Sequence, residues 1–403
     1  RMKLRADLLA RDLAALVAVP SVTGEERVAL ERLGELADRL GLQPALYRHD
    51  LHGLRAHPDY PGEETSRSEL WGLSVTVPGA GAGGRPRLAL AGHVDVVPAG
   101  SEAWRYGPWS GAIADGCVWG RGAVDMKGGV IAALHALAVA GPTASCEAVL
   151  LAVSSEEDGG LGTFAALERD AAFDACLIPE PVGFDAVCAH AGALTFQGVV
   201  HGVGAHAALR LQGASAIDRY LPIHAALAEH ERRLNSDIEH PLMRDLELPY
   251  PVVVGRLHAG EWSSTVPDHL LFEGRVGVRV GESLADARRA LEDAVAAAGD
   301  CAVELRWTGG QFAGADTPPD HPFATLVRDS LTAETGRQAR FTAIPSGTDM
   351  RLFCARGIPC VMAGTPGLDL AHAVNERVRV DDVLTLAQVI ARVIGEFPSP
   401  ARP

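Results

Sequence analysis

The amino-acid sequence predicts an α/β protein with a central, mostly parallel sheet and an inserted α+β domain. Short apolar runs alternate with helical patterns over residues 1–190 and again over residues 314–403, which is the order typical of a parallel sheet flanked by helices. Residues 191–313 differ, because strand patterns there surround two amphipathic helices. The length of 403 residues also exceeds the ~250–300 at which single cores stop growing. We therefore expect one discontinuous domain and one inserted domain.

Each element is predicted from its own residue pattern. Leucines at helical spacing predict a helix over residues 4–17, and Thr23 with Glu26 predicts a capping box for a second helix that ends near Gly41. The other expected elements of the discontinuous domain are strands at 88–91, 148–153, 175–178 and 359–363 and helices at 128–140, 164–168, 322–335 and 381–397. In the inserted domain we expect strands at 194–200, 252–257, 270–280 and 302–307 and helices at 214–234 and 283–298.

Composition and charge exclude several classes of protein. The net charge is −15 and no cluster of Lys or Arg could neutralise a run of phosphates, so we expect no nucleic-acid partner. No apolar run approaches the ~20 residues of a membrane span, and charged residues among the leucines of the N-terminus do not form a signal peptide, so a cytoplasmic location is expected. The seven cysteines lack a C-x-x-C pair, which indicates neither a disulfide framework nor a thiolate zinc site.

A His and an Asp follow the apolar run at 88–91. In Gly92-His93-Val94-Asp95 the two side chains share a face of an extended segment because they are two residues apart. A metal-binding imidazole usually gives its second ring nitrogen to a carboxylate, so His93 is a candidate ligand and Asp95 its orienting partner. The alternative is a polar pair that only caps the end of a strand.

Further candidate ligands follow other apolar runs, where open α/β sheets place their sites. Glu156 and Glu157 follow 148–153, and Glu180 follows 175–178. His372 comes shortly after 359–363, and Asp125 lies among glycines at the start of a predicted helix. The alternatives are a solvated acidic loop at 156–158 and a plain N-cap at Asp125.

The types of these residues indicate a metal centre. Imidazoles and carboxylates without thiolates suit Zn²⁺, Co²⁺ or Mn²⁺. Five protein ligands are too many for one catalytic zinc ion but suit two ions that share a bridging carboxylate. We therefore predict a site for two metal ions.

The candidate residues stand in a series of motifs that spans nearly the whole chain. The motifs are GHVDVVP (92–98), GRGAVDMKGG (120–129), SSEEDGG (154–160), PEP (179–181), GVGAHAA (202–208), SGTDMR (346–351) and HAVNE (372–376). In this order they resemble the zinc-dependent family of aminoacylase, acetylornithine deacetylase, succinyl-diaminopimelate desuccinylase and carboxypeptidase G.

The resemblance implies roles for the metal-site residues. His93 and Glu180 would hold one zinc ion and Glu157 and His372 the other, with Asp125 as the bridge. Glu156 would be the general base, which takes a proton from water and returns it to the leaving amine. A cis peptide bond after Asp125 is also implied.

The resemblance also implies that the inserted domain is a lid through which the protein forms a homodimer. His206 would reach into the partner's site, and Arg279, or alternatively Arg275, would hold the substrate carboxylate. Ser264 stands where the family often has an Asn that contacts substrate. Gly347 and Thr348 are further expected substrate contacts.

The predicted function is the removal of an N-acyl group of the acetyl or succinyl type from an amino acid or a related amino-carboxylate by a two-zinc enzyme. One alternative is a metallo-carboxypeptidase or dipeptidase, whose substrate would be a short peptide. Another is a non-catalytic zinc-binding scaffold. A dinucleotide or phosphate enzyme is disfavoured because the sequence has neither G-x-G-x-x-G after a strand nor a P-loop.

Overall fold

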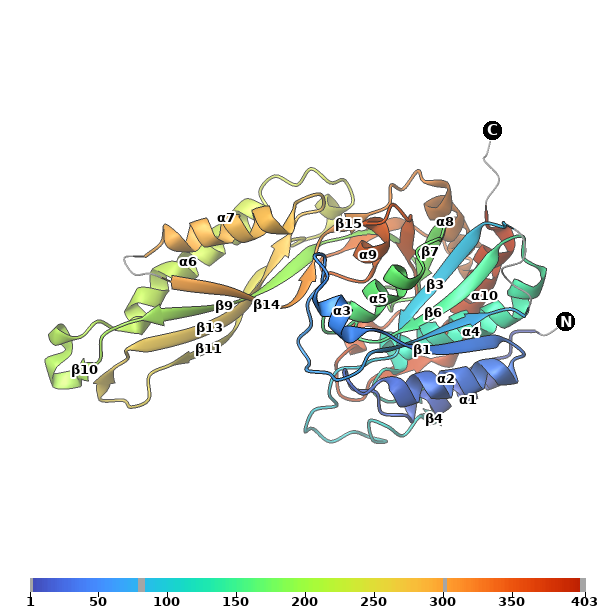
Figure 1. The fold of residues 1–403 in the computed structure, drawn as a ribbon, viewed down its shortest axis with the longest axis horizontal. Helices are drawn as coiled ribbons and strands as arrows, with labels where there is room; N and C mark the ends of the chain where they lie inside the picture. Colours follow the sequence, from blue (N-terminus) through green and yellow to red (C-terminus); the bar gives the residue numbers. More distant parts are fainter. Residues whose placement is uncertain (1–2, 79–83, 300–302, 399–403) are drawn as a thin grey trace. The chain divides into compact units, whose positions relative to one another are not determined.

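The chain divides into two compact units (Figure 1). The computed structural model describes residues 3–78, 84–299 and 303–398. Unit 1 comprises Arg1–Cys188, Asp316–Thr342 and Asp349–Pro403, and unit 2 comprises Ala189–Ala315 and Ala343–Thr348. The main changes of unit come after Cys188 and after Ala315. The short return of the chain to unit 2 at 343–348 is absent from the prediction, because so brief a segment has no pattern of its own.

A mixed sheet forms the centre of the fold, with strands in the order β1-β2-β6-β3-β7-β17-β8-β15 and β16 paired to β8. The middle strands β6, β3, β7 and β17 are parallel to one another, as predicted. The flanks differ from the prediction, because β1, β2 and β8 pair antiparallel. The strands are β1 (Gln43–Arg48), β2 (Trp71–Thr76), β3 (Arg87–His93), β6 (Glu147–Val153), β7 (Ala175–Ile178), β8 (Ala186–His190), β15 (Ala315–Asp316), β16 (Phe341–Ile344) and β17 (Cys360–Met362).

Helices pack on this sheet and on one another in unit 1. They are α1 (Ala6–Val17), α2 (Arg27–Arg39), α3 (Leu51–Arg55), α4 (Gly128–Ala140), α5 (Leu161–Arg169), α8 (Pro322–Thr335), α9 (Met350–Cys354) and α10 (Val380–Glu396). A small separate sheet has the order β18-β5-β4, from β4 (Ala112–Ala114), β5 (Cys117–Trp119) and β18 (Arg377–Arg379). Helix α4 packs against α1 and α10 and against strands β3 and β6.

Helix α4 is apolar all round, as expected of a helix buried in a core. With its flanks, Ala123–Thr143 is long and apolar enough to cross a membrane. However, 83% of the most apolar part of this segment is buried inside the protein, so packing in the core explains its apolar composition.

The predicted capping box at the start of α2 is wrong. No side chain caps this helix. Thr23 Oγ1 lies 3.3 Å from Asp95 Oδ2, and the Glu26 carboxylate accepts hydrogen bonds from the Gly24 amide and from Arg67. The Gly24 amide and the charged tertiary partners Arg67 and Asp95 therefore replace the predicted cap, because a charge-assisted hydrogen bond in a buried site is stronger than a neutral one.

Unit 2 is an antiparallel sheet covered by two helices, and its predicted strands and helices are confirmed. The strands β9 (Gly192–His201), β11 (Val252–Ala259), β13 (His269–Val278) and β14 (Val303–Phe312) lie in the order β11-β13-β9-β14. The helices are α6 (Ala216–Leu234) and α7 (Leu284–Ala296), and β10 (Ala205–His206) pairs with β12 (Thr265–Val266). Phe196, Phe272 and Tyr220 pack together in the core. Ala302, where a strand was predicted to begin, lies outside the described residues.

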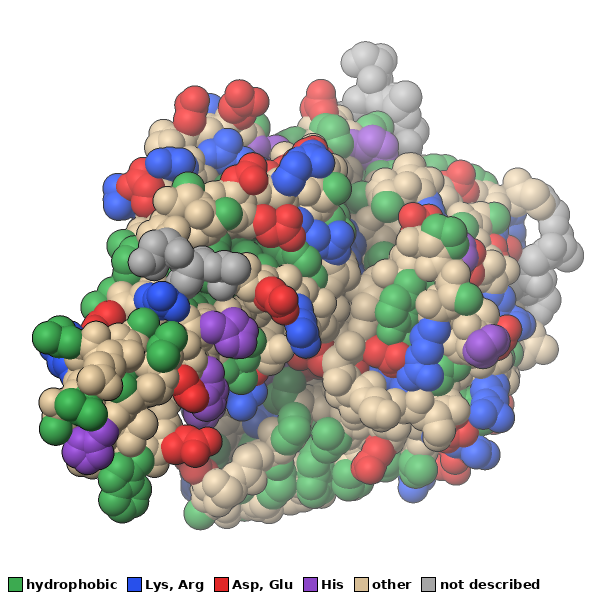
Figure 2. All heavy atoms as spheres, turned by 60° about the vertical axis from the view of Figure 1, so that its left-hand side comes forward, with side chains coloured by type: hydrophobic (Ala, Val, Ile, Leu, Met, Phe, Trp, Pro, Cys, Tyr) green, Lys and Arg blue, Asp and Glu red, His purple; other side chains and the backbone are tan. Residues whose placement is uncertain are grey.

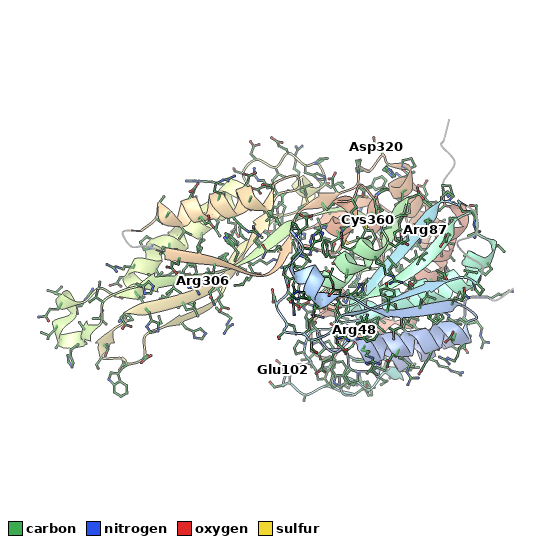
Figure 3. All side chains as sticks on the ribbon, viewed as in Figure 1. Arg48, Arg87, Glu102, Arg306, Asp320 and Cys360 are labelled. Carbon is green, nitrogen blue, oxygen red and sulfur yellow. The ribbon has the colours of Figure 1, made fainter. Side chains whose placement is uncertain are left out.

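The cysteines that the structure describes form no disulfide, in line with their irregular spacing. Cys176 on β7 and Cys360 on β17 are register partners in the central sheet. Figure 3 labels Cys360. Burial raises the pKa of the Cys360 thiol well above its usual value. Cys301 lies outside the described residues.

Candidate metal centre

Three of the predicted ligands meet because their strands are neighbours. His93 is the last residue of β3, Glu157 follows β6, and Glu180 follows β7. Strand β3 pairs in parallel with both β6 and β7, so the carboxyl ends of all three lie at one edge of the sheet. The apolar runs that position these residues are fully buried, which fixes their register.

All five predicted ligands gather in two groups that share Asp125. In the first group, His93 Nε2 lies 3.2 Å from Asp125 Oδ1 and 3.7 Å from Glu180 Oε1. In the second, His372 Nε2 lies 3.1 Å from Glu157 Oε1 and 3.5 Å from Asp125 Oδ2. The two oxygens of Asp125 therefore face different histidines, which is the arrangement of a bridging carboxylate.

The electrostatics of the cluster fit divalent cations. Burial raises the pKa of Glu180 to about 8. Hydrogen bonds to Asp125 and Glu157 raise the pKa of His372 to about 10. The three candidate carboxylates thus outnumber the two imidazoles, which leaves an excess of negative charge in a cluster where only His372 is exposed. Two divalent cations would neutralise the same charge, and the donor atoms are those that Zn²⁺, Co²⁺ and Mn²⁺ accept.

The structure corrects the predicted contact between His93 and Asp95. His93 Nδ1 donates to the backbone oxygen of Asp95 at 2.9 Å, whereas the nearer carboxylate oxygen is 3.6 Å away. The backbone carbonyl therefore fixes the imidazole tautomer and leaves Nε2 free to bind a metal. The Asp95 carboxylate instead accepts the amides of Glu156 and Glu157 at 3.2 and 3.1 Å. A backbone acceptor two residues on competes with the carboxylate, and sequence spacing cannot distinguish them.

Asp125 lies in an irregular turn, Ala123–Lys127, that leads into α4, and the predicted cis peptide bond Asp125–Met126 is present. The turn is held by Glu376, to which sequence analysis gave no role. Its Oε1 accepts the amides of Val124 and Asp125 at 3.0 and 3.1 Å, and its Oε2 pairs with Arg121 at 2.8 Å. The one available signal was that Glu376 ends the HAVNE motif.

Close backbone approaches hold Glu180 in place. A Cβ at Gly364 would lie 1.7 Å from the backbone oxygen of Glu180, and one at Gly129 would lie 2.0 Å from the backbone oxygen of Pro179. Only glycine fits at such contacts. The glycines after Asp125 thus allow α4 to begin directly against the Pro179-Glu180 segment.

Glu156 lies beside the ligands, in a small pocket that His93, Glu180, Thr163 and Asp349 also line. Burial, together with the charges of Asp349 and Glu180, raises the pKa of Glu156 well above its usual range. A carboxylate placed here, next to the ligands and held through its own amide by Asp95, is suited to accept and return a proton.

Comparisons with known proteins agree with this geometry. Residues 89–396 match the family described as peptidase family M20/M25/M40. The chain belongs to this family. Succinyl-diaminopimelate desuccinylase of Methylorubrum populi is 29% identical over 95% of this chain and 96% of the relative. The enzyme of the same name from Paracoccus denitrificans is 32% identical over 83% of this chain and 90% of the relative.

Solved structures of M20 proteins share the fold. An M20 family metallo-carboxypeptidase from Sulfolobus solfataricus has a TM-score of 0.74 and 16% identity, covering 98% of this chain and 99% of that one. A dinuclear metal-binding M20 peptidase from Bacillus subtilis has a TM-score of 0.64 and 16% identity, covering 96% and 97%. As a member of this family the chain is a hydrolase that acts on amide or peptide bonds.

The remaining site residues predicted for this M20 protein belong to unit 2. His206 and Ser264 are both exposed. They are neighbours, because the backbone amide of Ala207 donates to the backbone oxygen of Ser264 at 2.9 Å. Gly347 is tightly packed, since a Cβ there would lie 2.5 Å from that of Phe312, and Thr348 is buried. The five candidate metal ligands all belong to unit 1. Substrate contacts of these four residues therefore stay predictions.

Arg279 has a structural partner that the sequence did not suggest. Its Nε and Nη2 donate to the Leu234 oxygen at 3.0 and 2.7 Å, and Nη2 also donates to the Arg233 oxygen at 2.8 Å. These carbonyls end α6, so the guanidinium caps that helix. The predicted contact with a substrate carboxylate is not tested by this geometry. Arg275, the alternative, is an exposed residue on β13.

We expect Arg279→Met to lower the free energy of unfolding by ~1–3 kcal/mol, the usual effect of losing hydrogen bonds to a charged group. The reason is that the Leu234 carbonyl at the end of α6 loses both hydrogen bonds from the guanidinium, whereas the Arg233 carbonyl still accepts the Ser236 hydroxyl at 3.0 Å. Thermal unfolding of the purified protein checks this, with Arg306→Met as the control, because Arg306 is an exposed arginine of β14 in the same unit. A variant with unchanged stability and a raised KM would instead support the substrate-binding role.

Proposed function

We propose that this M20 protein is a two-zinc amidohydrolase that removes an N-acyl group of the succinyl or acetyl type from an amino acid or a related amino-carboxylate. The observation that carries the proposal is the pair of ligand groups that share Asp125, with Glu156 beside them. The desuccinylase relatives, which match along nearly the whole chain, support the acyl-group class.

The metal ions would be held by His93 and Glu180 on one side and by Glu157 and His372 on the other, with Asp125 between them. Bound there, two divalent cations supply Lewis acidity and lower the pKa of water towards neutrality. Zinc suits the donor set, and Co²⁺ or Mn²⁺ could replace it.

Glu156 performs the proton transfers in this proposal. Its carboxylate takes a proton from water as the water oxygen bonds to the acyl carbon, and it gives that proton to the amine nitrogen as the C–N bond breaks. The proton taken from water leaves with the amine, so Glu156 ends the cycle ionised. Asp95, which accepts the Glu156 amide, keeps the carboxylate in place during both transfers.

We also propose that the protein forms a homodimer through unit 2 and that His206 reaches the partner's site. The proposed location of the enzyme is the cytoplasm. Exposed apolar side chains support this surface: Val203, Leu209, Leu211, Ile217 and Leu221 lie near β10 and the start of α6. Leu211 is 96% exposed, and groups of exposed apolar side chains are typical of interaction surfaces. Figure 2 shows hydrophobic side chains at the left of the drawn face. Light scattering in solution tests the dimer.

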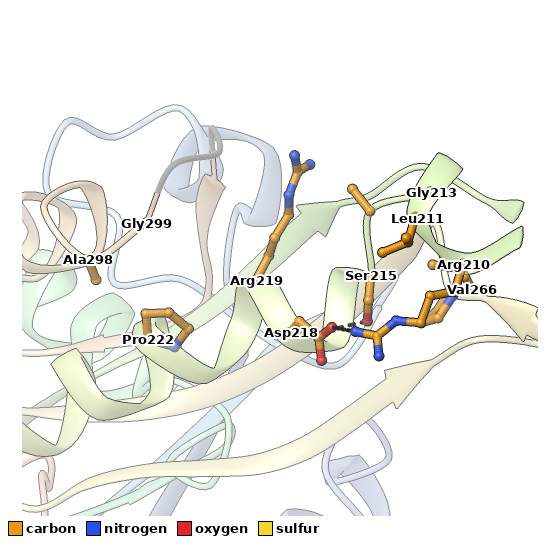
Figure 4. A pocket seen from close by; sticks show the side chains of 12 residues that line it. Arg210, Leu211, Gly213, Ser215, Asp218, Arg219, Pro222, Val266, Ala298 and Gly299 are labelled. Carbon is orange, nitrogen blue, oxygen red and sulfur yellow. Dashed lines mark hydrogen bonds and ion pairs between the residues drawn. The ribbon is translucent and has the colours of Figure 1, made fainter. Parts of the chain in front are cut away.

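A hollow of about 810 Å³ adjoins this surface (Figure 4). Leu211 and Pro222 line it together with the charged residues Arg210, Asp218 and Arg219. Arg210 pairs with Asp218 at 3.6 Å. Apolar contacts rimmed by charges are typical of subunit interfaces.

The experiment that tests the function is amine release by zinc- or cobalt-loaded protein from a panel of N-succinyl, N-acetyl and N-formyl amino acids and dipeptides. Turnover of an N-acyl amino acid supports the proposal. Preference for dipeptides would favour a peptidase or carboxypeptidase instead. Binding of two metal ions without hydrolysis of any compound would favour a scaffold.

A further inference from the structure

A fully buried arginine lies next to the turn that carries Glu156 and Glu157. The Arg67 side chain is 0% exposed. It donates to Glu26 Oε1 at 3.0 Å and to both carboxylate oxygens of Asp158 at 3.0 and 3.1 Å, and it lies 3.3 Å from Glu63 Oε2. A buried ion cluster is weak evidence for stability, because desolvation offsets much of the attraction. Its location suggests a different role.

Asp158 connects Arg67 to the catalytic turn. It directly follows Glu157, and its carboxylate also accepts the Thr65 amide at 2.9 Å and the Ser155 hydroxyl. Ser155 begins the turn with a φ of 67°, a left-handed conformation that few residues adopt without support. Arg67 and Thr65 thus hold one side of the turn from a loop distant in sequence.

Asp95 holds the other side of the same turn through the Glu156 and Glu157 amides. Thr23 Oγ1 contacts Asp95, and Glu26, three residues on, contacts Arg67. The hydrogen bonds therefore close a ring that runs through Asp95, the turn, Asp158, Arg67 and the 23–26 segment. In this ring Arg67 supplies positive charge between carboxylates.

We propose that Arg67 is a positioning residue for hydrolysis, which acts through Asp158 to fix the turn that presents Glu156 to the substrate and Glu157 to the metal. The inference rests on the proposed role of Glu156. A shift of about 1 Å in such a turn can lower the rate by about 100-fold, because the proton acceptor and the reacting atoms lose alignment.

The test compares Arg67→Met, Arg67→Lys and Asp158→Asn with the wild type. Residues that support metal ligands typically change affinity or activity ~10–100-fold, so we expect kcat of Arg67→Met to fall by this factor with KM nearly unchanged. Zinc titration of metal-free protein by calorimetry should show a similar loss of affinity for one of two ions. Lysine restores the charge without the fork geometry, so Arg67→Lys should recover part of the loss.

Two controls separate positioning from stability. Arg87→Met removes an arginine, labelled in Figure 3, that begins β3, the strand that His93 ends. Arg87 pairs with Asp170 at 2.9 Å. The substitution should lower the melting temperature without changing kcat or zinc affinity. If Arg67 acts through Asp158, the double variant Arg67→Met/Asp158→Asn should be no slower than the worse single variant.

Unchanged kcat and zinc affinity in folded Arg67→Met would overturn the inference. Should that variant not fold, the nearly isosteric Asp158→Asn decides, and unchanged kinetics and zinc titration there would count equally against it. If the wild type hydrolyses nothing on the panel, the proposed function fails, but the zinc titration of the variants still tests the role of Arg67.

Discussion

Glu156→Gln is expected to lower kcat by about 10²–10⁴-fold, the usual contribution of a general base. Glutamine keeps the shape of the side chain and the hydrogen bond from the backbone amide of residue 156 to the Asp95 carboxylate, but it cannot accept a proton from the reacting water. Because Glu156 is not in either ligand group, the variant should still bind two metal ions. Amine release under saturating substrate, together with metal analysis of the same samples, measures both quantities.

The matched control for this substitution is Glu102→Gln, at an exposed position labelled in Figure 3. It makes the same chemical change away from the ligand groups and should leave kcat unaltered. If Glu156→Gln retains the wild-type kcat, another group accepts the proton and the proposed mechanism is wrong.

Asp125→Asn is expected to affect both metal ions, whereas His372→Ala should affect one. Asp125 is the only residue that the two groups of described ligands share, and an amide nitrogen cannot replace its second carboxylate oxygen. We expect a loss of zinc affinity of at least ~100-fold at both sites, the upper range already seen for residues that merely support ligands. Activity at low zinc should fall below detection.

Thermal unfolding provides an independent measure of the Asp125 effect. A ligand at 100 times its Kd stabilises the native state by about 2.7 kcal/mol, so wild-type protein should unfold at a higher temperature with zinc than with a chelator. In Asp125→Asn this difference should largely disappear. Two ions bound with wild-type affinity in that variant would contradict the bridging role.

Much of the fold could be predicted from local patterns. The helices at 128–140 and 322–335 occur at the predicted residues, and the parallel strands that carry His93 and Glu180 were expected. Strands β1 and β2 were not expected; the edge strand β1 is largely exposed and lacks a continuous apolar run. The antiparallel pairing of the outer strands was not predicted either, because the direction in which a strand joins the sheet depends on the path of the chain and not on the residue pattern of the strand.

Residue patterns alone were enough to predict the five candidate metal ligands, because each belongs to a short motif and most come shortly after an apolar run. Tertiary structure alone decided how they are supported. Glu376 contacts the Asp125 amide across 251 positions, and Arg67 contacts Asp158 across 91. Such contacts leave no periodic signal, because a supporting side chain needs only the right place in space. For the same reason, the choice of His93 between the backbone oxygen and the carboxylate of Asp95 emerged only from the folded chain.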